Sequence, residues 1–375
     1  MADTAINASH AISGIPGYVG LIPVRNLWLL MLYASDLMRQ SGVARRALEE
    51  LPDDIPDLVA EILARLVKRR LKRNLSCGYR IRDAHLTRVR GHINILETEC
   101  GQLLDRGRIA CRFEELTVDT PRNRFVRAAL DEVGNIVNRR EIARRCRSLA
   151  ASLRRMGVVG EKPSLAELSV DRFGRCDVED RHMVSVAHLV FNLALPTEAA
   201  GRNYLSVPDR QIAWIRKLYE KAVAGFYDVV LPKPDWRVDA GKVIAWPVER
   251  KTTGIDKILP AMRTDIVLTQ ISTGRRIVID TKFNSIVTAG WYREESLRSG
   301  YMYQIYAYVR SQEDPADPLS LNTEGLLLHP SVGNDIDETA VIQGHEIRFA
   351  TVDLGSEAKE IRKQLLSVVG VIENR

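Results

Sequence analysis

The chain has 375 residues, of which 45% are hydrophobic and 27% charged, and its formal net charge is +6. This length is too great for one ordinary hydrophobic core, so we expect two domains, and the modest basic excess suits a phosphate-binding surface without requiring one. The five cysteines are widely spaced and include no Cys-x-x-Cys pair, which argues against a disulfide framework or a zinc cluster and favours a reducing cytoplasm.

The N-terminal segment is expected to be a flexible tail over residues 1–20. It contains no Lys or Arg and no long apolar core of the kind found in secretory signals. The apolar run from Leu27 to Ala34 is too short to cross a membrane. These features predict a cytoplasmic protein without membrane association.

Two helices and a β-rich stretch are predicted next. Residues 22–40 are expected to form a helix, with Pro23 before it and Asn26 as its N-cap. Residues 57–73 form an amphipathic pattern, with apolar side chains at i+4 spacing on one face and basic side chains on the other. Residues 76–100 alternate arginines with other residues, as in short half-exposed strands.

Helices continue to the predicted domain boundary. One is expected over 121–139, where Pro121 suits the first turn, and a basic helix is expected over 139–155. Residues 163–195 are predicted to be helical with interruptions. The periodicity is lost over 197–203, and we place the domain boundary near this segment.

The second half of the chain changes character, because apolar strands there alternate with helices. This alternation predicts an α/β core, or α+β overall once the mixed helical and β N-terminal half is included. Helices are expected over 209–230 and about 294–311. Strands are expected over 243–248, 265–270, 276–280 and 325–329.

The residues with the clearest chemical meaning lie in two apolar segments joined by a Ser-Thr-Gly turn, which predicts a β-hairpin. Asp265 opens the first strand and Asp280 closes the second, so antiparallel pairing makes them neighbours. Lys282 projects to the same face of its strand as Asp280, two residues earlier. The two carboxylates repel each other unless a cation lies between them, and Mg²⁺ favours such a site with room for water and phosphate oxygens.

This arrangement predicts metal-assisted phosphodiester hydrolysis. A metal at Asp265 and Asp280 can lower the pKa of a bound water, while Lys282 orients that water and stabilises developing charge. The alternative is a surface hairpin with an acid at each end and a solvated lysine, because the motif is short. The apolar run Ile277–Ile279 favours the catalytic interpretation, since buried strands rarely deliver a charge at their end.

Three further residues are weighed as site candidates. Gln304 and Tyr308 share one face of the predicted helix, although an aromatic core face is the alternative and is preferred for Tyr306. Glu220 lies on the helix before the strands and is either an additional acid at the metal or an exposed helix glutamate.

Two other sequence features bear on the function. Glu249-Arg250-Lys251 also reads acid-x-Lys, but Pro247 interrupts that strand, so Asp280-Thr281-Lys282 is preferred. The sequence contains no Gly-x-x-x-x-Gly-Lys-Ser/Thr loop. Any nucleotide hydrolysis that powers this system is therefore expected in another subunit.

Together these motifs resemble the McrC family, the nuclease subunits of McrBC-type restriction systems directed at modified (5-methylcytosine) DNA. The resemblance covers nearly the whole chain from about residue 20. It is carried by the stretches 22–27, 31–34, 90–93, 120–124, 259–266, 279–283, 303–304 and 325–330.

The resemblance implies a PD-(D/E)xK restriction-endonuclease-like domain over 206–375, with Thr264 where the name of the motif has proline. It implies a partner-docking N-terminal domain over 21–205. It assigns catalytic roles to five residues and a Mg²⁺ site, which Mn²⁺ could also occupy, to the two aspartates. The five residues are Asp265, Asp280, Lys282, Gln304 and Glu220.

The resemblance also implies partners. These are an McrB-like AAA+ GTPase ring, which binds the GTP, and double-stranded DNA. The basic helices at 65–73 and 139–155 could face the ring or DNA, with a solvated helix surface as the simpler alternative for most of their arginines. The competing functions are a non-catalytic activator of an AAA+ ring and a free-standing nuclease of repair or transposition.

Overall fold

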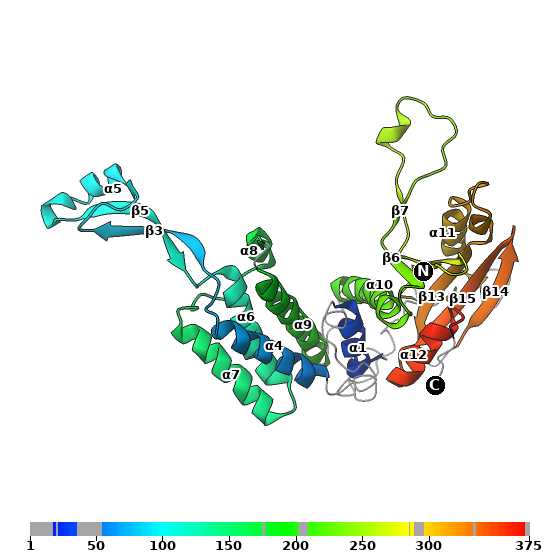
Figure 1. Cartoon of the computed structure of the whole chain (residues 1–375), viewed down its shortest axis with the longest axis horizontal. Coiled ribbons are helices and arrows are strands. Elements are labelled where there is room, and N and C mark those ends of the chain that lie inside the picture. Colours follow the sequence, from blue (N-terminus) through cyan, green and yellow to red (C-terminus); the bar gives the residue numbers. More distant parts are fainter. Residues whose placement is uncertain are drawn as a thin grey trace. The chain divides into compact units, whose positions relative to one another are not determined.

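The computed structural model describes residues 18–19, 22–35, 55–174, 177–201, 209–284, 286–288, 296–332 and 335–371. They divide into two compact units (Figure 1). One unit comprises the described residues within Met1–Ile55 and Leu195–Arg375, and the other comprises those within Pro56–Ala194. Among the described residues, no helix combines the length and the apolar character needed to cross a membrane.

The unit within Pro56–Ala194 is built on helices whose apolar faces form its core. The predicted helices of this region are confirmed, with small changes at their ends. Residues at i+4 spacing in the first helix, Val59, Leu63 and Val67, are all buried. The helices are α4 (Ile55–Leu71), α6 (Pro121–Ile136), α7 (Arg140–Arg155), α8 (Leu165–Val170) and α9 (Val178–Gly201).

A three-stranded antiparallel sheet of the same unit extends away from these helices (Figure 1). Its order is β3-β5-β4. The prediction of strands throughout 76–100 is wrong at its end, because Asn94 accepts a hydrogen bond from the backbone N–H of Glu97 and caps a short helix. The elements are β3 (Gly78–Leu86), β4 (His92–Ile93), α5 (Ile95–Cys100), the 3₁₀ turn η2 (Leu104–Arg106) and β5 (Ile109–Thr117).

The other unit is centred on a six-stranded mixed sheet of order β14-β15-β13-β10-β9-β6. β13 is parallel to both β10 and β15, and the remaining neighbours are antiparallel. This arrangement confirms the expected α/β character of the second half. The strands are β6 (Trp236–Ala240), β9 (Ile266–Gln270), β10 (Arg276–Thr281), β13 (Glu324–Ser331), β14 (Asp337–Ile342) and β15 (His345–Asp353).

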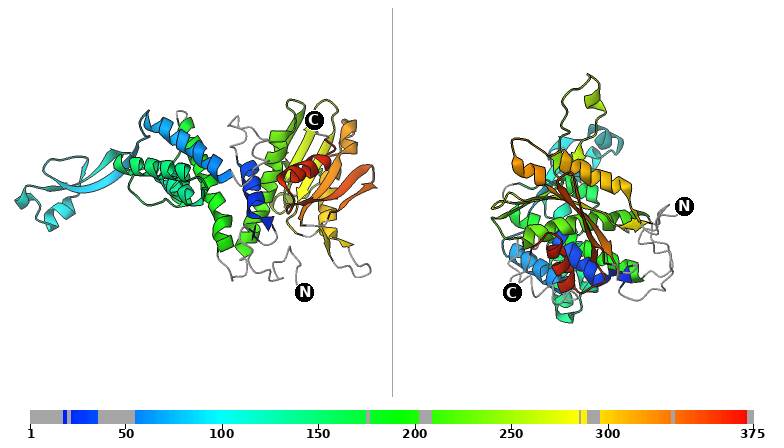
Figure 2. Two further views of the ribbon diagram at one scale, coloured as in Figure 1. Left: turned by 90° about the horizontal axis from the view of Figure 1, so that it is seen from below. Right: turned by 90° about the vertical axis from the view of Figure 1, so that its right-hand side faces the viewer.

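Helices cover both faces of this sheet (Figure 2). α11 (Ser299–Arg310) makes the crossover between the parallel strands β10 and β13 and packs through Ile305 and Val309 on Val278 and Leu327. The opposite face is covered by the helices α1 (Val24–Ala34), α10 (Asp209–Val230) and α12 (Ala358–Ser367).

The remaining described elements are short. Tyr18–Val19 (β1) pairs with Ile22–Pro23 (β2), so part of the tail expected over 1–20 is a strand, while residues 1–17 and 20 lie outside the described residues. The strand expected over 243–248 stops after its first two residues. The others are β7 (Val243–Ile244), η3 (Ile255–Lys257), β8 (Met262–Arg263), β11 (Val287–Thr288), β12 (Ser296–Leu297) and η4 (Pro318–Asn322).

The position of α1 differs from expectation. The helix begins at Val24 rather than at residue 22 and ends at Ala34, and residues 36–40 lie outside the described part. Asn26 is not its N-cap: its side-chain amide instead donates to the carbonyl of Leu354 at 2.7 Å. The helix therefore belongs to the sheet unit, and the expected division into 21–205 and 206–375 does not match the compact units.

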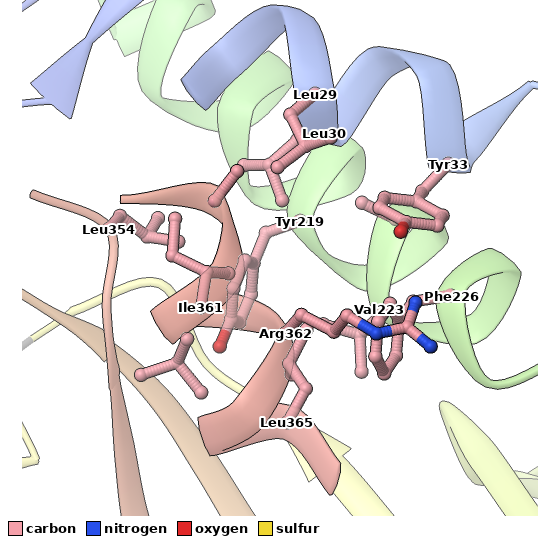
Figure 3. Close-up of a pocket in the computed structure, with 13 residues that line it drawn as sticks. Leu29, Leu30, Tyr33, Tyr219, Val223, Phe226, Leu354, Ile361, Arg362 and Leu365 are labelled. Atoms are coloured by element: carbon pink, nitrogen blue, oxygen red, sulfur yellow. The ribbon is translucent and has the colours of Figure 1, made fainter. Parts of the chain in front are cut away.

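An apolar pocket lies where α1, α10 and α12 meet. A methyl group on Gly225 of α10 would lie 1.9 Å from the carbonyl oxygen of Tyr33, so only glycine permits this close helix approach. The lining side chains point toward one another from the three helices and β15, and they form a structural core rather than a polar site (Figure 3). Those labelled are Leu29, Leu30, Tyr33, Tyr219, Val223, Phe226, Leu354, Ile361, Arg362 and Leu365.

The end of α9 also differs from expectation. The helix continues to Gly201, through most of the segment 197–203 in which the sequence pattern loses its periodicity. The two compact units separate at Ala194 and Leu195, close to the expected boundary but within a helix. Residues 202–208 lie outside the described part of the chain.

Candidate metal-dependent hydrolytic site

The predicted hairpin is confirmed in β9 and β10. Ile279 pairs with Ile266 in antiparallel register, and the same register continued by one residue places Asp280 opposite Asp265. Gly274 adopts a φ of +71° in the connecting turn, a conformation that favours glycine. The short turn fixes the register, and the register brings the two carboxylates together.

Asp280 is fully buried at the end of β10, on the α11 side of the sheet with Val278. Burial raises the pKa of Asp280 to about 6; the ammonium of Lys282 opposes this shift, while Asp265 and Glu220 add to it. A carboxylate buried this deeply requires a cation to remain ionised at neutral pH.

Lys282 supplies part of that compensation. Its Nζ donates to Oδ1 of Asp280 at 3.0 Å and lies 2.8 Å from Oδ2. The approach to Oδ2 lacks hydrogen-bond geometry, so this buried oxygen has no donor among the described residues. The lysine side chain is 19% exposed, which leaves it accessible from the solvent side of the site.

Asp265 is half-buried, and its carboxylate is held by Thr281, the residue between Asp280 and Lys282. Its Oδ2 accepts hydrogen bonds from the backbone N–H of Thr281 at 2.7 Å and from the Thr281 hydroxyl at 2.8 Å. Thr281 thus fixes the orientation of one carboxylate while its chain neighbours present the second acid and the lysine. The sequence interpretation assigned no role to this threonine.

Glu220 of α10 lies within electrostatic reach of both aspartates. Burial, and then the charge of Asp265, raise the pKa of Glu220, while Arg263 lowers it. The side chain is half-buried rather than on an open helix surface. The structure therefore brings Glu220 to the edge of the site.

Gln304 reaches the site through Tyr308. Its Nε2 donates to the Tyr308 hydroxyl at 2.7 Å, and that hydroxyl donates to the carbonyl of Arg263 at 2.8 Å. Burial raises the pKa of Tyr308, with smaller contributions from Asp280 and Asp265. Tyr306 packs on the sheet core, as expected for that residue.

A second group of residues surrounds Lys282. Its Nζ lies 5.1 Å from the ring centroid of Tyr301, whose hydroxyl accepts from the side-chain amide of Asn284 at 2.5 Å. The carbonyl of Asn284 accepts from Nδ1 of His329 at 2.9 Å. Burial lowers the pKa of His329 to about 4, so the ring is neutral at physiological pH. Only the resemblance in 325–330 pointed to this histidine.

The donor set fits a hard cation that keeps most of its water. In the described part of the chain, no three Asp, Glu, His or Cys side chains converge tightly enough to enclose a metal. Two opposed aspartates are nevertheless sufficient for Mg²⁺, which keeps several waters and uses one or two carboxylates. The donorless Oδ2 of Asp280 is the buried atom that such a cation would satisfy.

The competing acid-x-Lys sequence is placed elsewhere. Glu249 lies on an exposed irregular segment beyond β7, and Pro247 follows the end of that strand. Lys251 pairs with Asp256 rather than with Glu249. The geometry therefore favours Asp280-Thr281-Lys282 over Glu249-Arg250-Lys251.

Comparison with known proteins gives one family match and a related enzyme. Residues 7–320 match the family described as "McrBC 5-methylcytosine restriction system component". The chain is 23% identical to "Type IV methyl-directed restriction enzyme EcoKMcrBC" of Escherichia coli strain K12 over 351 residues, which cover 93% of this chain and 97% of that protein.

Two solved structures from Thermococcus gammatolerans are similar at lower identity. A half-complex from a tetradecameric assembly of McrB AAA+ hexamers with bound McrC gives a TM-score of 0.42 at 15% identity, covering 92% of this chain and 76% of that one. The cryo-EM structure of the McrBC complex gives a TM-score of 0.34 at 16% identity, covering 56% and 59%.

Proposed function

The chain belongs to the McrBC 5-methylcytosine restriction system component family, and from this premise we propose that it is the subunit that cleaves DNA in such a system. The proposal specifies a PD-(D/E)xK-type endonuclease that depends on Mg²⁺ and accepts Mn²⁺. The observation that carries it is the convergence of Asp265, Asp280 and Lys282 at one end of the β9–β10 hairpin.

The residues would divide the work as follows. Asp265 and Asp280 hold the metal, and Thr281 keeps the carboxylate of Asp265 oriented. When bound, the metal supplies a water of lowered pKa and neutralises charge on the phosphate. Lys282, whose Nζ lies beside Asp280, would hold the attacking water and stabilise the developing charge.

Glu220 and Gln304 are assigned supporting roles. Glu220 approaches the aspartates closely enough for their charges to interact, which suits an acid that contacts metal-bound water. Gln304 orients the hydroxyl of Tyr308. That hydroxyl donates a hydrogen bond to the backbone carbonyl of Arg263, two residues before Asp265.

We further propose that a GTP-hydrolysing AAA+ ring of the McrB type is the partner and that it binds the GTP. The Thermococcus structures contain McrB AAA+ hexamers with bound McrC. The docking region is assigned to the unit within Pro56–Ala194 rather than to 21–205, because α1 is part of the sheet unit. The alternative of a non-catalytic activator does not account for the assembled Asp265, Asp280 and Lys282.

The test is DNA cleavage by the full chain with its AAA+ partner, GTP and Mg²⁺. Asp280→Ala should abolish cleavage, and Lys282→Ala should lower its rate by about 10² to 10³-fold. Mn²⁺ binding, measured by calorimetry, should be weakened by the first substitution and retained by the second, because lysine is not a ligand.

Asp337→Asn is the matched control. It removes a carboxylate from β14, where the side chain pairs with Arg348 at the far edge of the sheet. Cleavage should continue in this variant. Cleavage at the wild-type rate by Asp280→Ala would overturn the proposed function.

A further inference from the structure

A β-arm leaves the sheet unit just before the proposed metal site. β7 and β8 pair antiparallel at its base, and residues 245–261 extend beyond them, away from the six-stranded sheet (Figures 1 and 2). The indole N–H of Trp246 donates to the carbonyl of Pro260 at 2.7 Å and joins the two sides of the arm.

We propose that this arm, residues 242–263, binds the phosphate backbone of double-stranded DNA on the approach to the metal site. The inference rests on the proposed function, because that function supplies the DNA. It goes further in assigning the surface that holds the duplex.

The arm concentrates positive charge. Its 22 residues contain five basic and two acidic side chains, for a net charge of +3, which is half the net charge of the whole chain. Arg250 and Lys257 are exposed and make no ion pair with any described residue. A concentrated cationic segment of this kind attracts a polyanion and releases counterions on contact.

The ion pair within the arm does not cancel this charge. Lys251 lies 2.8 Å from Asp256, but the two side chains are 58% and 62% exposed. Exposed pairs of this kind contribute little stability, so Lys251 can exchange its carboxylate for a phosphate.

The arm is buried at its base and exposes apolar side chains beyond it. Ile244 and Met262 anchor its base in the sheet core, whereas Trp246, Val248 and Ile258 beyond the base are exposed. Exposed apolar side chains among cations form an unpartnered surface. The excess of cations favours DNA over a protein as the partner, because phosphates are contacted mainly by Lys, Arg and polar groups.

Backbone hydrogen bonds connect the base of the arm to the proposed metal site. The backbone N–H of Gly241 donates to the carbonyl of Asp265 at 2.7 Å, and that of Thr264 donates to the carbonyl of Lys242 at 3.0 Å. Arg263, the last residue of the arm, lies close enough to Glu220 to lower its pKa. A duplex held by the arm would therefore lie beside the carboxylates that cleave it.

The experiment measures binding of the full chain to an unmodified fluorescent duplex by anisotropy, with Ca²⁺ present and over a range of salt concentrations. The double variant Arg250→Ala with Lys257→Ala is compared with Lys233→Ala with Lys363→Ala. The control removes the same charge from exposed lysines elsewhere in the unit. The arm variant should bind about tenfold more weakly, and the slope of log K against log salt should fall by about two, since each phosphate contact contributes about one.

Three results would overturn the inference. The arm variant could show the same affinity and slope as the control, or the wild-type chain could show no binding to the duplex. The arm variant could also bind DNA normally while failing to co-elute with the AAA+ partner, which would make the arm a protein-docking element. Loss of cleavage in Asp280→Ala alongside any of these results would leave the proposed nuclease function in place, so the two failures are distinguishable.

Discussion

The side-chain amide of Asn26 donates to the carbonyls of Leu354 and Ser356, at 2.7 and 2.9 Å, across more than three hundred residues of sequence. Asn26 is almost fully buried in α1, and its two acceptors lie in the connection between β15 and α12. One side chain therefore joins the beginning of the sheet unit to its end.

Asn26→Leu should destabilise the sheet unit by about 1–3 kcal/mol, because one buried and one part-buried carbonyl lose their donor. Chemical denaturation in the presence of EDTA measures the change. Arg25→Ala, at the half-exposed neighbouring position, should leave the midpoint nearly unchanged. An Asn26→Leu protein as stable as this control would show that the bonds to the C-terminal connection do not hold α1 in place.

Gly225→Ala should destabilise the same unit by about 3 kcal/mol, because the added methyl collides with the carbonyl of Tyr33 and forces α1 and α10 apart. Gly300→Ala is the matched control, since Gly300 also lies in a helix but has open space around it. There the substitution should be neutral or stabilise by up to about 1 kcal/mol through helix propensity. Thermal unfolding of both variants decides the comparison, and equal melting temperatures would contradict the close helix contact.

The stability of the metal-free protein should depend on the titration of Asp280. Its native pKa of about 6 lies above the ordinary value of 3.8, so the native state holds the proton more tightly than the unfolded chain does. The stability contributed by the protonated form is therefore lost as pH rises from about 4 to about 6. Above about pH 6 the native state bears the full free-energy cost of an ionised, buried Asp280.

Asp280→Asn should remove this dependence and stabilise the metal-free protein at pH 7 by about 3 kcal/mol. Urea unfolding in EDTA at pH 4.5 and pH 7.5 measures the difference between variant and wild type. The two proteins should differ much less at the lower pH. A constant difference at both values would mean that Asp280 does not titrate in this range.

Thr281→Val should weaken cleavage or metal affinity by about 10- to 100-fold, because Asp265 loses one of its two hydrogen bonds from this residue while the fold is retained. Thr281→Ser keeps the hydroxyl and should restore most of the activity. Mn²⁺ titration of both variants, together with cleavage in the presence of the AAA+ partner, tests the pair. Equal loss in the serine variant would point to the methyl group rather than to the hydroxyl.

The convergence of Asp265 and Asp280 could be predicted from the sequence largely because it is local. Asp265 and Asp280 belong to two strands joined by a short turn, and a short turn leaves little freedom in the register. Thr281 was not predicted, because a side chain that hydrogen-bonds a neighbouring carboxylate produces no periodic pattern in the sequence. No sequence signal marked Tyr301, and only the family resemblance marked His329, because it is the folding of β13 and α11 that brings both residues beside Lys282.

The arrangement of the outer elements could not be predicted in the same way. The periodicity of α1 indicates an apolar helix but does not indicate which surface it covers, and its partner lies at the other end of the chain. β14 is mostly exposed, so the alternation that marks a half-buried strand is absent. β14 is a strand because it pairs antiparallel with β15, which the sequence pattern does not indicate.

The interruption of the sheet unit by residues 56–194 has a consequence for synthesis on the ribosome. α1 precedes the intervening unit in the sequence, whereas the surfaces it covers, on α10, β15 and α12, emerge only after that unit. The intervening unit is continuous in sequence and can fold while translation proceeds, whereas α1 must wait for its partners. The sheet that supports Asp280 also includes β15, so this support is complete only after the whole intervening unit and β15 have been synthesised.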